Sequence, residues 1–302
     1  MDAAPGSRPD VLIGFAEDGD LAPRLAARLD IPYRQVQLHR FPDGESLVRL
    51  EGTPDHAVIL RPLNQPNAKL VELQFLAGTL RERGTRRIDL VAPYLAYMRQ
   101  DMEFRPGEVV SQRILGRWLG GLFDLILAVE PHLHRTHTLA EIFPGCRAEA
   151  LTAGSLIADW ARGLGADAGW VVLGPDEEAC TLVQSVAGPL GVASLCARKE
   201  RRGDRDVTVT LPPGSDLSGR TVLLVDDVVS SGGTLLDGAR VAKRHGAARL
   251  LAFTTHAVFA PEMLGVFAEA GIERVGSADG VPHPSNAVTL APLLAEALAR
   301  LG

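Results

Sequence analysis

The stretch from Arg220 to Leu235, RTVLLVDDVVSSGGTL, constrains the fold of this 302-residue chain more than any other part. The run from Val222 to Val225 is continuously aliphatic, which is typical of a parallel strand buried on both faces. Two carboxylates, Asp226 and Asp227, stand at the carboxyl end of this predicted strand. A small-residue segment then leads into a predicted helix, so the stretch indicates a strand–loop–helix unit of an α/β protein.

The loop after this strand has the chemistry of a sugar phosphate site. Its hydroxyls can donate to a phosphate, its glycine amides can approach one closely, and the helix N-terminus favours an anion. The two acids before it suit the vicinal hydroxyls of a ribose. An ordinary turn, in which one aspartate caps the helix, is the simpler alternative. The loop residues are Ser230, Ser231, Gly232, Gly233 and Thr234, and no Lys follows the glycines as in a Walker motif.

Composition describes an ordinary globular protein that is long enough for two domains, with 46% hydrophobic and 23% charged residues. A net charge of -6 argues against a general nucleic-acid binder. The three cysteines, Cys146, Cys180 and Cys196, are widely spaced and form no CxxC pair, so neither a disulfide framework nor a zinc site is predicted, and we expect a reducing compartment. Neither a signal peptide nor an apolar run of about 18 residues is evident, so we expect a cytoplasmic protein without a membrane partner.

Strand-like and helix-like segments alternate along the chain, which predicts an α/β fold. We place the domain boundary near Leu151 to Gly154, giving domains 8–152 and 153–302. The connection from Pro93 to Val110 is long and charged, and such loops are often functional. The main predicted strands are Val11–Phe15, Tyr33–Leu38, His56–Arg61, Ile88–Ala92, Leu125–Val129, Trp170–Leu173, Ala193–Ala197 and Leu250–His256.

Two polar clusters follow predicted strands of the first half, where open α/β sheets bind ligands. Arg99, Gln100 and Asp101 offer donors for a polyphosphate and an acid for a hydroxyl or amine. A surface loop with chance arginines is the alternative. His132 could be a hydrogen-bonded structural residue, or its neutral imidazole could hold a divalent cation.

Three further segments each have a simple structural alternative. Asp176, at a predicted helix start, could only cap that helix. The segment FPDGE, from Phe41 to Glu45, could be only the turn of a hairpin at Asp43-Gly44. The charged run from Lys199 to Asp206 predicts an exposed, mobile excursion, and a solvated hairpin tip is its alternative.

Taken together and in this order, the motifs resemble those of the ribose-phosphate pyrophosphokinases, the synthetases of phosphoribosyl pyrophosphate. The resemblance runs from about Gly14 to Leu298 and includes FPDGE, YMRQDMEFRPGE, VEPHLHR, GPDEEA, a K-x-R loop and LLVDDVVSSGGT. Three of these motifs, FRPGE, PHLHR and GPDEEA, resemble those of the archaeal-type branch of the family. Glu130-Pro131 and residues 278–280 depart from the family pattern. The resemblance implies two phosphoribosyltransferase-like domains, each a mainly parallel sheet flanked by helices.

The resemblance also implies an activity: transfer of the β,γ-pyrophosphoryl group of ATP to the anomeric hydroxyl of ribose 5-phosphate, with Mg²⁺ as cofactor. Ribose 5-phosphate would occupy the motif from Asp226 to Thr234, and Lys199 and Arg201 would act on the transition state. The implied ATP-binding residues are Phe41, Asp43, Glu45, Arg99, Gln100 and Asp101, and those near magnesium are His132 and Asp176. The FPDGE segment would reach ATP bound by a neighbouring subunit, so a homo-oligomer is implied, a dimer or a multiple of dimers.

Two other functions remain open from the sequence. A phosphoribosyltransferase that uses phosphoribosyl pyrophosphate would share VDDVVSSGGT but would leave FPDGE and YMRQD unexplained. A non-catalytic regulatory paralogue of the synthetase would be expected to have a damaged reactive loop, yet Lys199, Arg201, His132 and Asp176 are all present.

Overall fold

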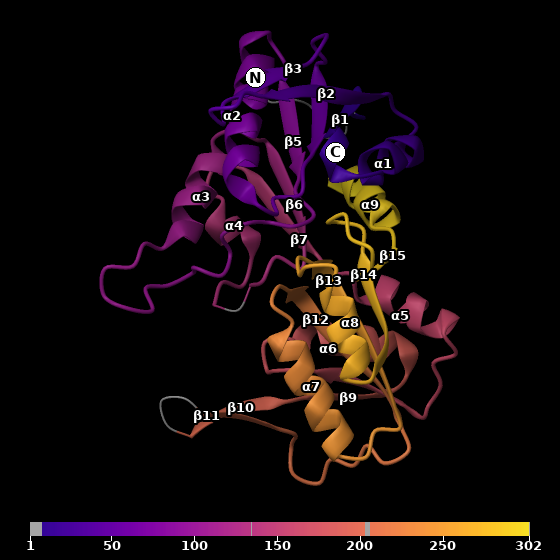
Figure 1. Ribbon diagram of the computed structural model, residues 1–302. Helices are drawn as coiled ribbons and strands as arrows, with labels where there is room; N and C mark the ends of the chain where they lie inside the picture. Colours follow the sequence, from indigo (N-terminus) through magenta and orange to yellow (C-terminus); the bar gives the residue numbers. More distant parts are fainter. Residues whose placement is uncertain (1–7, 134, 203–205, 302) are drawn as a thin grey trace. The chain divides into compact units, whose positions relative to one another are not determined.

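The computed structural model describes residues 8–133, 135–202 and 206–301, and it divides into two compact units (Figure 1). Unit 1 holds the described residues up to Leu151, together with Gly280–Pro282 and the chain from Thr289 onward. Unit 2 holds Thr152–Asp279 and His283–Val288. The domains predicted from the sequence, 8–152 and 153–302, are continuous, whereas the structure assigns the C-terminal helix to unit 1.

Unit 1 is built on a seven-stranded sheet in the order β3-β2-β1-β4-β5-β6-β7, which is parallel except for the β2–β3 pair. Figure 1 shows α2, α3 and α4 on one face of the sheet and α1 with α9 on the other. The strands are β1 (Val11–Phe15), β2 (Tyr33–Arg40), β3 (Ser46–Arg49), β4 (His56–Leu60), β5 (Arg87–Val91), β6 (Leu125–Val129) and β7 (Arg147–Leu151). The helices are α1 (Leu21–Leu29), α2 (Pro66–Glu82), α3 (Ser111–Gly120), α4 (Leu139–Ile142) and α9 (Ala291–Leu301), and a 3-10 turn, Ala16–Asp18, follows β1.

The core of unit 1 follows from the hydrophobic pattern of its elements. Strands β1, β4 and β6 bury all five of their residues, as expected for central parallel strands covered on both faces. On α2, the leucines at positions 70, 73, 76 and 80 recur at helical spacing and are buried against the sheet. The aliphatic strands and the leucine stripe therefore fix which face of α2 is turned inward.

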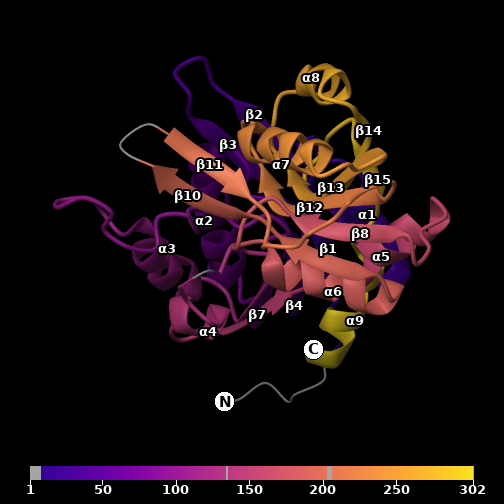
Figure 2. The same cartoon turned by 90° about the horizontal axis from the view of Figure 1, so that it is seen from below.

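Unit 2 holds a six-stranded parallel sheet in the order β15-β14-β13-β12-β8-β9 and a separate antiparallel ribbon of β10 and β11. Figure 2 shows α7 and α8 on one face of the sheet, with α5 and α6 on the other. The strands are β8 (Trp170–Gly174), β9 (Ala193–Cys196), β10 (Arg198–Arg202), β11 (Asp206–Thr210), β12 (Thr221–Val229), β13 (Arg249–Ala257), β14 (Ile272–Ala278) and β15 (Asn286–Val288). The helices are α5 (Gly154–Gly163), α6 (Cys180–Leu190), α7 (Gly233–Arg244) and α8 (Met263–Glu269).

The predicted fold class is confirmed, since each unit is a mainly parallel sheet flanked by helices. The predicted strands occur within one or two residues of their expected ends, apart from β12, which runs four residues further. Strand β12 continues to Val229, so Asp226 and Asp227 lie within it rather than after it. Strands β7 and β14 did not stand out in the sequence because polar and small residues interrupt their aliphatic pattern. No helix among the described residues is long and apolar enough to cross a membrane.

The expectation that the cysteines form no disulfide is wrong. Cys180 and Cys196 are bonded to each other, with their Cα atoms 5.8 Å apart. Cys180 begins α6 and Cys196 ends β9, and because α6 connects two parallel strands, both residues lie near the carboxyl edge of the sheet. This proximity depends on the crossover and not on a local spacing. Cys146 is free, and burial raises the pKa of its thiol to about 11.

Candidate active site

The strand order of unit 2 places the predicted sugar phosphate motif at a topological switch point. From β8 the chain continues to β9 on one side, and it later returns to form β12 on the other side. In open α/β sheets, ligands bind outside the carboxyl ends of the strands at such a point. Asp176 follows β8 and the Asp226-Asp227 pair lies near the end of β12, so the fold brings these three carboxylates to one place.

The register of β12 explains how its acids are presented. Strand β12 pairs with β8 only as far as Leu224, whereas its pairing with β13 continues to Val229. The strand therefore extends past its neighbour on the β8 side at the two aspartates. Asp226 is buried and Asp227 is half-buried. The Asp226 carboxylate accepts a hydrogen bond from the Asp227 backbone amide at 3.0 Å, which links the pair locally.

Electrostatics distinguish Asp226 from an ordinary carboxyl group. Burial raises its pKa well above the usual range, and the nearby carboxylates of Asp227 and Asp176 raise it further. Perturbed carboxyl groups of this kind cluster at functional sites. A divalent cation, or a ligand hydroxyl that donates to a carboxylate, would relieve this crowding of negative charge.

The loop that follows β12 leads directly into α7. Ser230 and Ser231 are exposed, and Gly232 is the residue before the helix, with a left-handed φ of 81°. A Cβ atom at Gly232 would lie 2.7 Å from the Phe267 ring, so both the backbone angle and the packing require glycine. Gly233 and Thr234 open the helix. The loop thus presents small residues and backbone amides at the N-terminus of a twelve-residue helix, which favours an anion.

Asp176 combines a local structural role with its place among the acids. Its Oδ1 accepts a hydrogen bond from the backbone amide of Glu178 at 3.1 Å, which closes a local turn. Helix α6 begins only at Cys180, after Ala179 as its N-cap and without a side-chain cap, so the capping alternative for Asp176 is wrong. The electrostatic effect of Asp176 on Asp226 is an additional relation that this turn does not account for. The next residue, Glu177, forms an ion pair with Arg198 at 3.2 Å and so links this loop to the start of β10.

In the charged run that begins at Lys199, the described residues up to Arg202 lie on β10 and Asp206 begins β11, and these two strands pair antiparallel. Lys199 and Arg201 lie on β10, opposite Val209 and Val207 of β11. Their side chains and residues 203–205 are outside the described part of the structure. The backbone therefore places both predicted catalytic residues on one ribbon, and their transition-state role and the mobility of the segment stay predictions.

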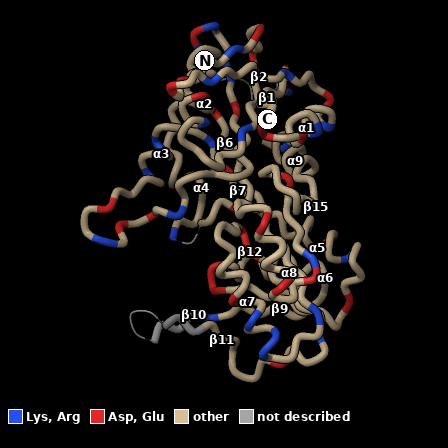
Figure 3. The backbone as a smooth tube through the Cα atoms, in the orientation of Figure 1, with Lys and Arg blue, Asp and Glu red and all other residues tan. Residues whose placement is uncertain are grey.

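In unit 1, the long connection from β5 to α3 carries Arg99, Gln100 and Asp101. Charged residues of both signs occur along it (Figure 3). The Gln100 side chain donates to Glu108 at 3.3 Å, and Arg99 is exposed. Asp101 is buried and accepts two hydrogen bonds from Arg135, at 2.9 and 3.1 Å. Sequence reasoning missed Arg135, although its place three residues after His132 was a usable signal.

Strained backbone marks the same edge of unit 1. Among the described residues, five other than glycine have positive φ, and two of these, Asp30 and Gln65, flank helices. The other three are Tyr97, Glu130 and His132, with φ angles of 62°, 41° and 56°. They follow the neighbouring strands β5 and β6, so the sheet brings the 99–101 loop and His132 to one edge. Strain of this kind is found preferentially at functional sites.

The FPDGE segment forms the turn between β2 and β3, as predicted. The Phe41 amide donates to the Glu45 carbonyl at 2.8 Å, and the Gly44 amide donates to the Phe41 carbonyl at 2.9 Å. The side chains of Phe41, Asp43 and Glu45 are exposed. Because β1 and β4 lie between β2 and β5, sheet order does not bring this turn to the 99–101 loop.

The predicted metal residues belong to different units. His132 lies in unit 1 and Asp176 lies in unit 2, so their pairing stays a prediction. Among the residues described, no group of three or more His, Cys, Asp and Glu side chains is arranged to hold a metal ion by itself. The carboxylates around Asp226 nevertheless fit magnesium, which prefers oxygen ligands and commonly uses one or two carboxylates together with substrate phosphates and water.

The fold and the loop at the switch point define the class of protein. Residues 150–263 match the phosphoribosyl transferase domain family, and residues 11–120 match the N-terminal domain of ribose phosphate pyrophosphokinase. A solved structure of phosphoribosylpyrophosphate synthetase from Mycobacterium smegmatis has the same fold, with a TM-score of 0.82 over 96% of this chain and 97% of that one, at 24% identity.

Curated relatives specify the family. Ribose-phosphate pyrophosphokinase from Methanopyrus kandleri is 34% identical over 96% of this chain and 99% of its own length. The enzyme of the same name from Pyrococcus furiosus is 33% identical over 86% of this chain and 91% of its own length. The chain belongs to the ribose-phosphate pyrophosphokinase family, which confirms the resemblance stated from the motifs and the enzyme class that it implied.

Proposed function

We propose that this protein transfers the β,γ-pyrophosphoryl group of magnesium-ATP to the anomeric hydroxyl of ribose 5-phosphate, forming phosphoribosyl pyrophosphate and AMP. The observation that carries the proposal is the switch point of unit 2. There, three carboxylates and a small-residue loop at a helix N-terminus lie at the position where open α/β sheets bind ligands.

The sugar phosphate fits this site by simple complementarity. The 5-phosphate would accept hydrogen bonds from the amides and hydroxyls of the Ser230–Thr234 loop. The 2- and 3-hydroxyls would donate to the Asp226 and Asp227 carboxylates. Magnesium, when bound by Asp176 and His132 together with substrate oxygens, would neutralise charge on the phosphates. Arg99, Gln100 and Asp101 would contact the nucleotide, and the Arg135 guanidinium would hold the Asp101 carboxylate in place.

The reaction needs no covalent intermediate with the enzyme. The anomeric oxygen forms a bond to the β-phosphorus, the bond from that phosphorus to the αβ-bridging oxygen breaks, and this oxygen leaves with AMP. The anomeric proton passes to solvent. Catalysis is then alignment and stabilisation of charge, which we assign to Lys199 and Arg201 on the β10–β11 ribbon.

Unit 1 carries features that support a homo-oligomer. Five large apolar side chains are exposed on neighbouring elements of this unit, and the Trp118 indole donates to Gln74 at 2.7 Å, which links α3 to α2. The five residues are Leu47, Val71, Phe75, Ile114 and Trp118. We propose that a second copy of the chain covers them, so that the FPDGE turn serves the nucleotide of the neighbour. Light scattering should detect at least a dimer at assay concentration, and a monomer alone would contradict this proposal.

The activity can be tested with an isotope. Ribose 5-phosphate labelled with ¹⁸O at the anomeric position, together with ATP and magnesium, should give phosphoribosyl pyrophosphate with ¹⁸O bridging the sugar and the β-phosphorus. The label should shift that ³¹P resonance, and unlabelled AMP should appear in equal amount. AMP formed without the sugar would overturn the proposal. Release of pyrophosphate from phosphoribosyl pyrophosphate only when a nucleobase is added would indicate a phosphoribosyltransferase instead.

A further inference from the structure

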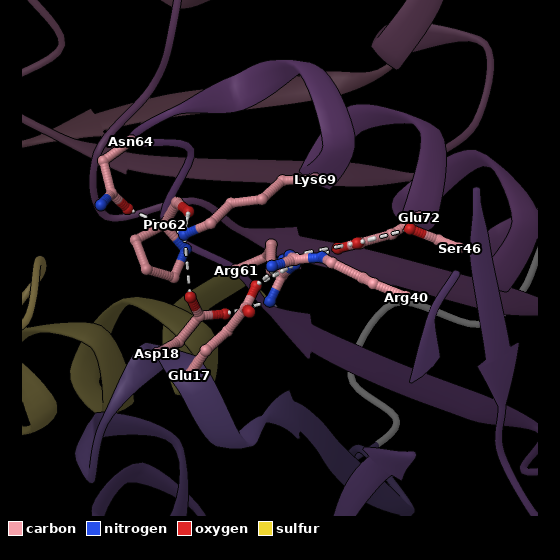
Figure 4. A network of polar contacts seen from close by, with 9 residues as sticks. All are labelled: Glu17, Asp18, Arg40, Ser46, Arg61, Pro62, Asn64, Lys69 and Glu72. Atoms are coloured by element: carbon pink, nitrogen blue, oxygen red, sulfur yellow. Dashed lines mark hydrogen bonds and ion pairs between the residues drawn. The ribbon is translucent and has the colours of Figure 1, made fainter. Parts of the chain in front are cut away.

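A buried carboxylate on α2, Glu72, holds both strands at the base of the FPDGE turn (Figure 4). Its Oε1 accepts hydrogen bonds from Ser46 Oγ at 3.0 Å and from Arg40 Nη2 at 3.3 Å. Arg40 ends β2, Ser46 begins β3, and the two are opposite each other in the ladder. One carboxylate oxygen therefore bridges the two residues that directly flank the turn.

Glu72 is itself held by a fully buried cation. Arg61 follows β4 and donates to Glu72 Oε2, to Asp18 at 2.8 Å and to Glu17 at 2.8 Å, and its guanidinium stacks on the Phe15 ring at 3.7 Å. These contacts fix the guanidinium between α2 and the end of β1. The Glu72 carboxylate thus has a rigid support on the side away from the turn.

The same network has a second end that does not touch the turn. Lys69 donates to Asp18 at 2.9 Å, to the Pro62 carbonyl at 2.8 Å and to Asn64 Oδ1 at 2.8 Å (Figure 4). Asn64 and Ser46 are both half-buried, and each contributes one side-chain hydrogen bond to a buried charged residue. Asn64 therefore provides a matched control for Ser46.

We propose that Glu72 is a positioning residue for the nucleotide, acting through the orientation of the FPDGE turn. The turn lies on an edge ribbon of the sheet and its own side chains are exposed, so its direction depends on how its base is fixed. A binding group must be held within a fraction of an ångström by its supporting residues to contribute fully. This inference rests on the proposed assignment of Phe41, Asp43 and Glu45 to ATP.

The main test is Glu72→Gln, which keeps the shape of the side chain and removes its charge. We expect the KM for ATP to rise about tenfold, with kcat and the KM for ribose 5-phosphate within about threefold of the wild type, because nucleotide placement and not chemistry is changed. A merely structural role would lower the thermal unfolding temperature and the amount of active enzyme without changing the KM for ATP.

The matched pair is Ser46→Ala and Asn64→Ala, each of which removes one neutral hydrogen-bonding group. Ser46→Ala should raise the KM for ATP about threefold, and Asn64→Ala should leave it unchanged. In the double variant Ser46→Ala/Glu72→Gln the effects on this KM should be less than multiplicative, because both substitutions break the same contact.

The outcomes separate this inference from the proposed function. A folded Glu72→Gln enzyme with a normal KM for ATP overturns the inference. If Glu72→Gln does not fold, equal KM values for Ser46→Ala and Asn64→Ala overturn it. Phe41→Ala tests the underlying assignment of the FPDGE turn to ATP. If the KM for ATP is normal in this variant as well, the turn does not bind the nucleotide. If the KM for ATP is raised in Phe41→Ala but normal in Glu72→Gln, the turn binds the nucleotide and only the positioning role of Glu72 is wrong.

Discussion

The two units place charged residues at the same topological position but balance them in opposite ways. In unit 1 the strand order reverses between β1 and β4. Asp18 follows β1, and Arg61 follows β4. Burial raises the pKa of Asp18, and Arg61 and Lys69 oppose that rise. In unit 2 the corresponding position lies between β8 and β12, where neighbouring carboxylates add to the rise in the pKa of Asp226.

The difference indicates how one architecture can support two roles. At a switch point the connections that follow two neighbouring parallel strands lead to opposite sides, which leaves a crevice at the carboxyl ends of these strands. Polar groups lie at this position in both units. Unit 1 supplies its own cations to its buried acids, and the resulting network supports a hairpin. Unit 2 groups acids with acids, and we propose that a cation and a sugar supply the compensating charge and hydrogen bonds there.

The largest effect should come from removing the central cation of unit 1. Arg61→Met would leave Glu17, Asp18 and Glu72 without the guanidinium that contacts all three. Breaking a buried ion pair by removing one partner typically costs about 3–5 kcal/mol, so we expect a loss of that size in the free energy of unfolding. Urea unfolding followed by circular dichroism would measure it.

A control for this variant is Arg86→Met. Arg86 pairs with Asp55 at 2.6 Å, and both side chains are largely exposed, so the loss should be at most about 1 kcal/mol. Equal losses in the free energy of unfolding for Arg61→Met and Arg86→Met would mean that Arg61 contributes no more to stability than an exposed ion pair does.

The next largest effect concerns Lys199, on the ribbon of unit 2. If its ammonium stabilises charge only as the pyrophosphoryl group moves, Lys199→Ala should lower kcat about a hundredfold and change both Michaelis constants only a few-fold. Arg198 is the matched control, because it is the preceding residue of β10 and already pairs with Glu177. If kcat for Lys199→Ala is as high as kcat for Arg198→Ala, the segment is only a solvated hairpin and Lys199 has no catalytic role.

A smaller change is expected from the sugar contact of Asp227. Asp227→Ala should raise the KM for ribose 5-phosphate about tenfold and leave the KM for ATP within about threefold, because a ground-state contact to the sugar is removed. Steady-state kinetics with each substrate varied in turn would measure this. Asp237, an exposed carboxylate on α7 that pairs with Arg240, is a control whose replacement by Asn should change neither constant. A tenfold rise in the KM for ATP instead would indicate that Asp227 contacts the nucleotide and not the sugar.

The sequence predicted most of the fold because central strands such as β1, β4, β6 and β8 are largely aliphatic runs, which can be recognised without tertiary information. It also predicted the strand–loop–helix motif that the structure places at the unit 2 switch point. It did not predict Arg61 and Glu72 as a network, since each looked like an ordinary charged residue and their meeting depends on strand order. The Cys180–Cys196 bond and the Arg135–Asp101 pair were missed for the same reason.

The sequence shows that Asp226 and Asp227 are adjacent, but it does not show that Asp226 is buried or that Asp176 lies near it. These two facts lead to the smallest predicted effect on stability. Without ligands, Asp226→Asn should raise the unfolding temperature at pH 8, because it removes a buried carboxylate that lies beside two others. A gain of about 1 kcal/mol corresponds to about 2–4 °C for a domain of this size. Activity should fall in the same variant, because the neutral amide accepts the sugar hydroxyl more weakly than a carboxylate does and replaces one acceptor oxygen with an NH₂ donor.

The pH dependence of this gain tests its cause. The pKa of Asp226 in the folded state is raised above its ordinary value of 3.8, so between these values the folded state binds more protons than the unfolded state. The contribution of Asp226 to stability is therefore present at low pH and is lost as pH rises through this window. The difference in unfolding temperature between Asp226→Asn and wild type should vanish near pH 3.8 and grow above it, whereas Asp237→Asn should give no such trend. A variant less stable than wild type at every pH would mean that Asp226 is balanced as Asp18 is, and the contrast between the two switch points would fail.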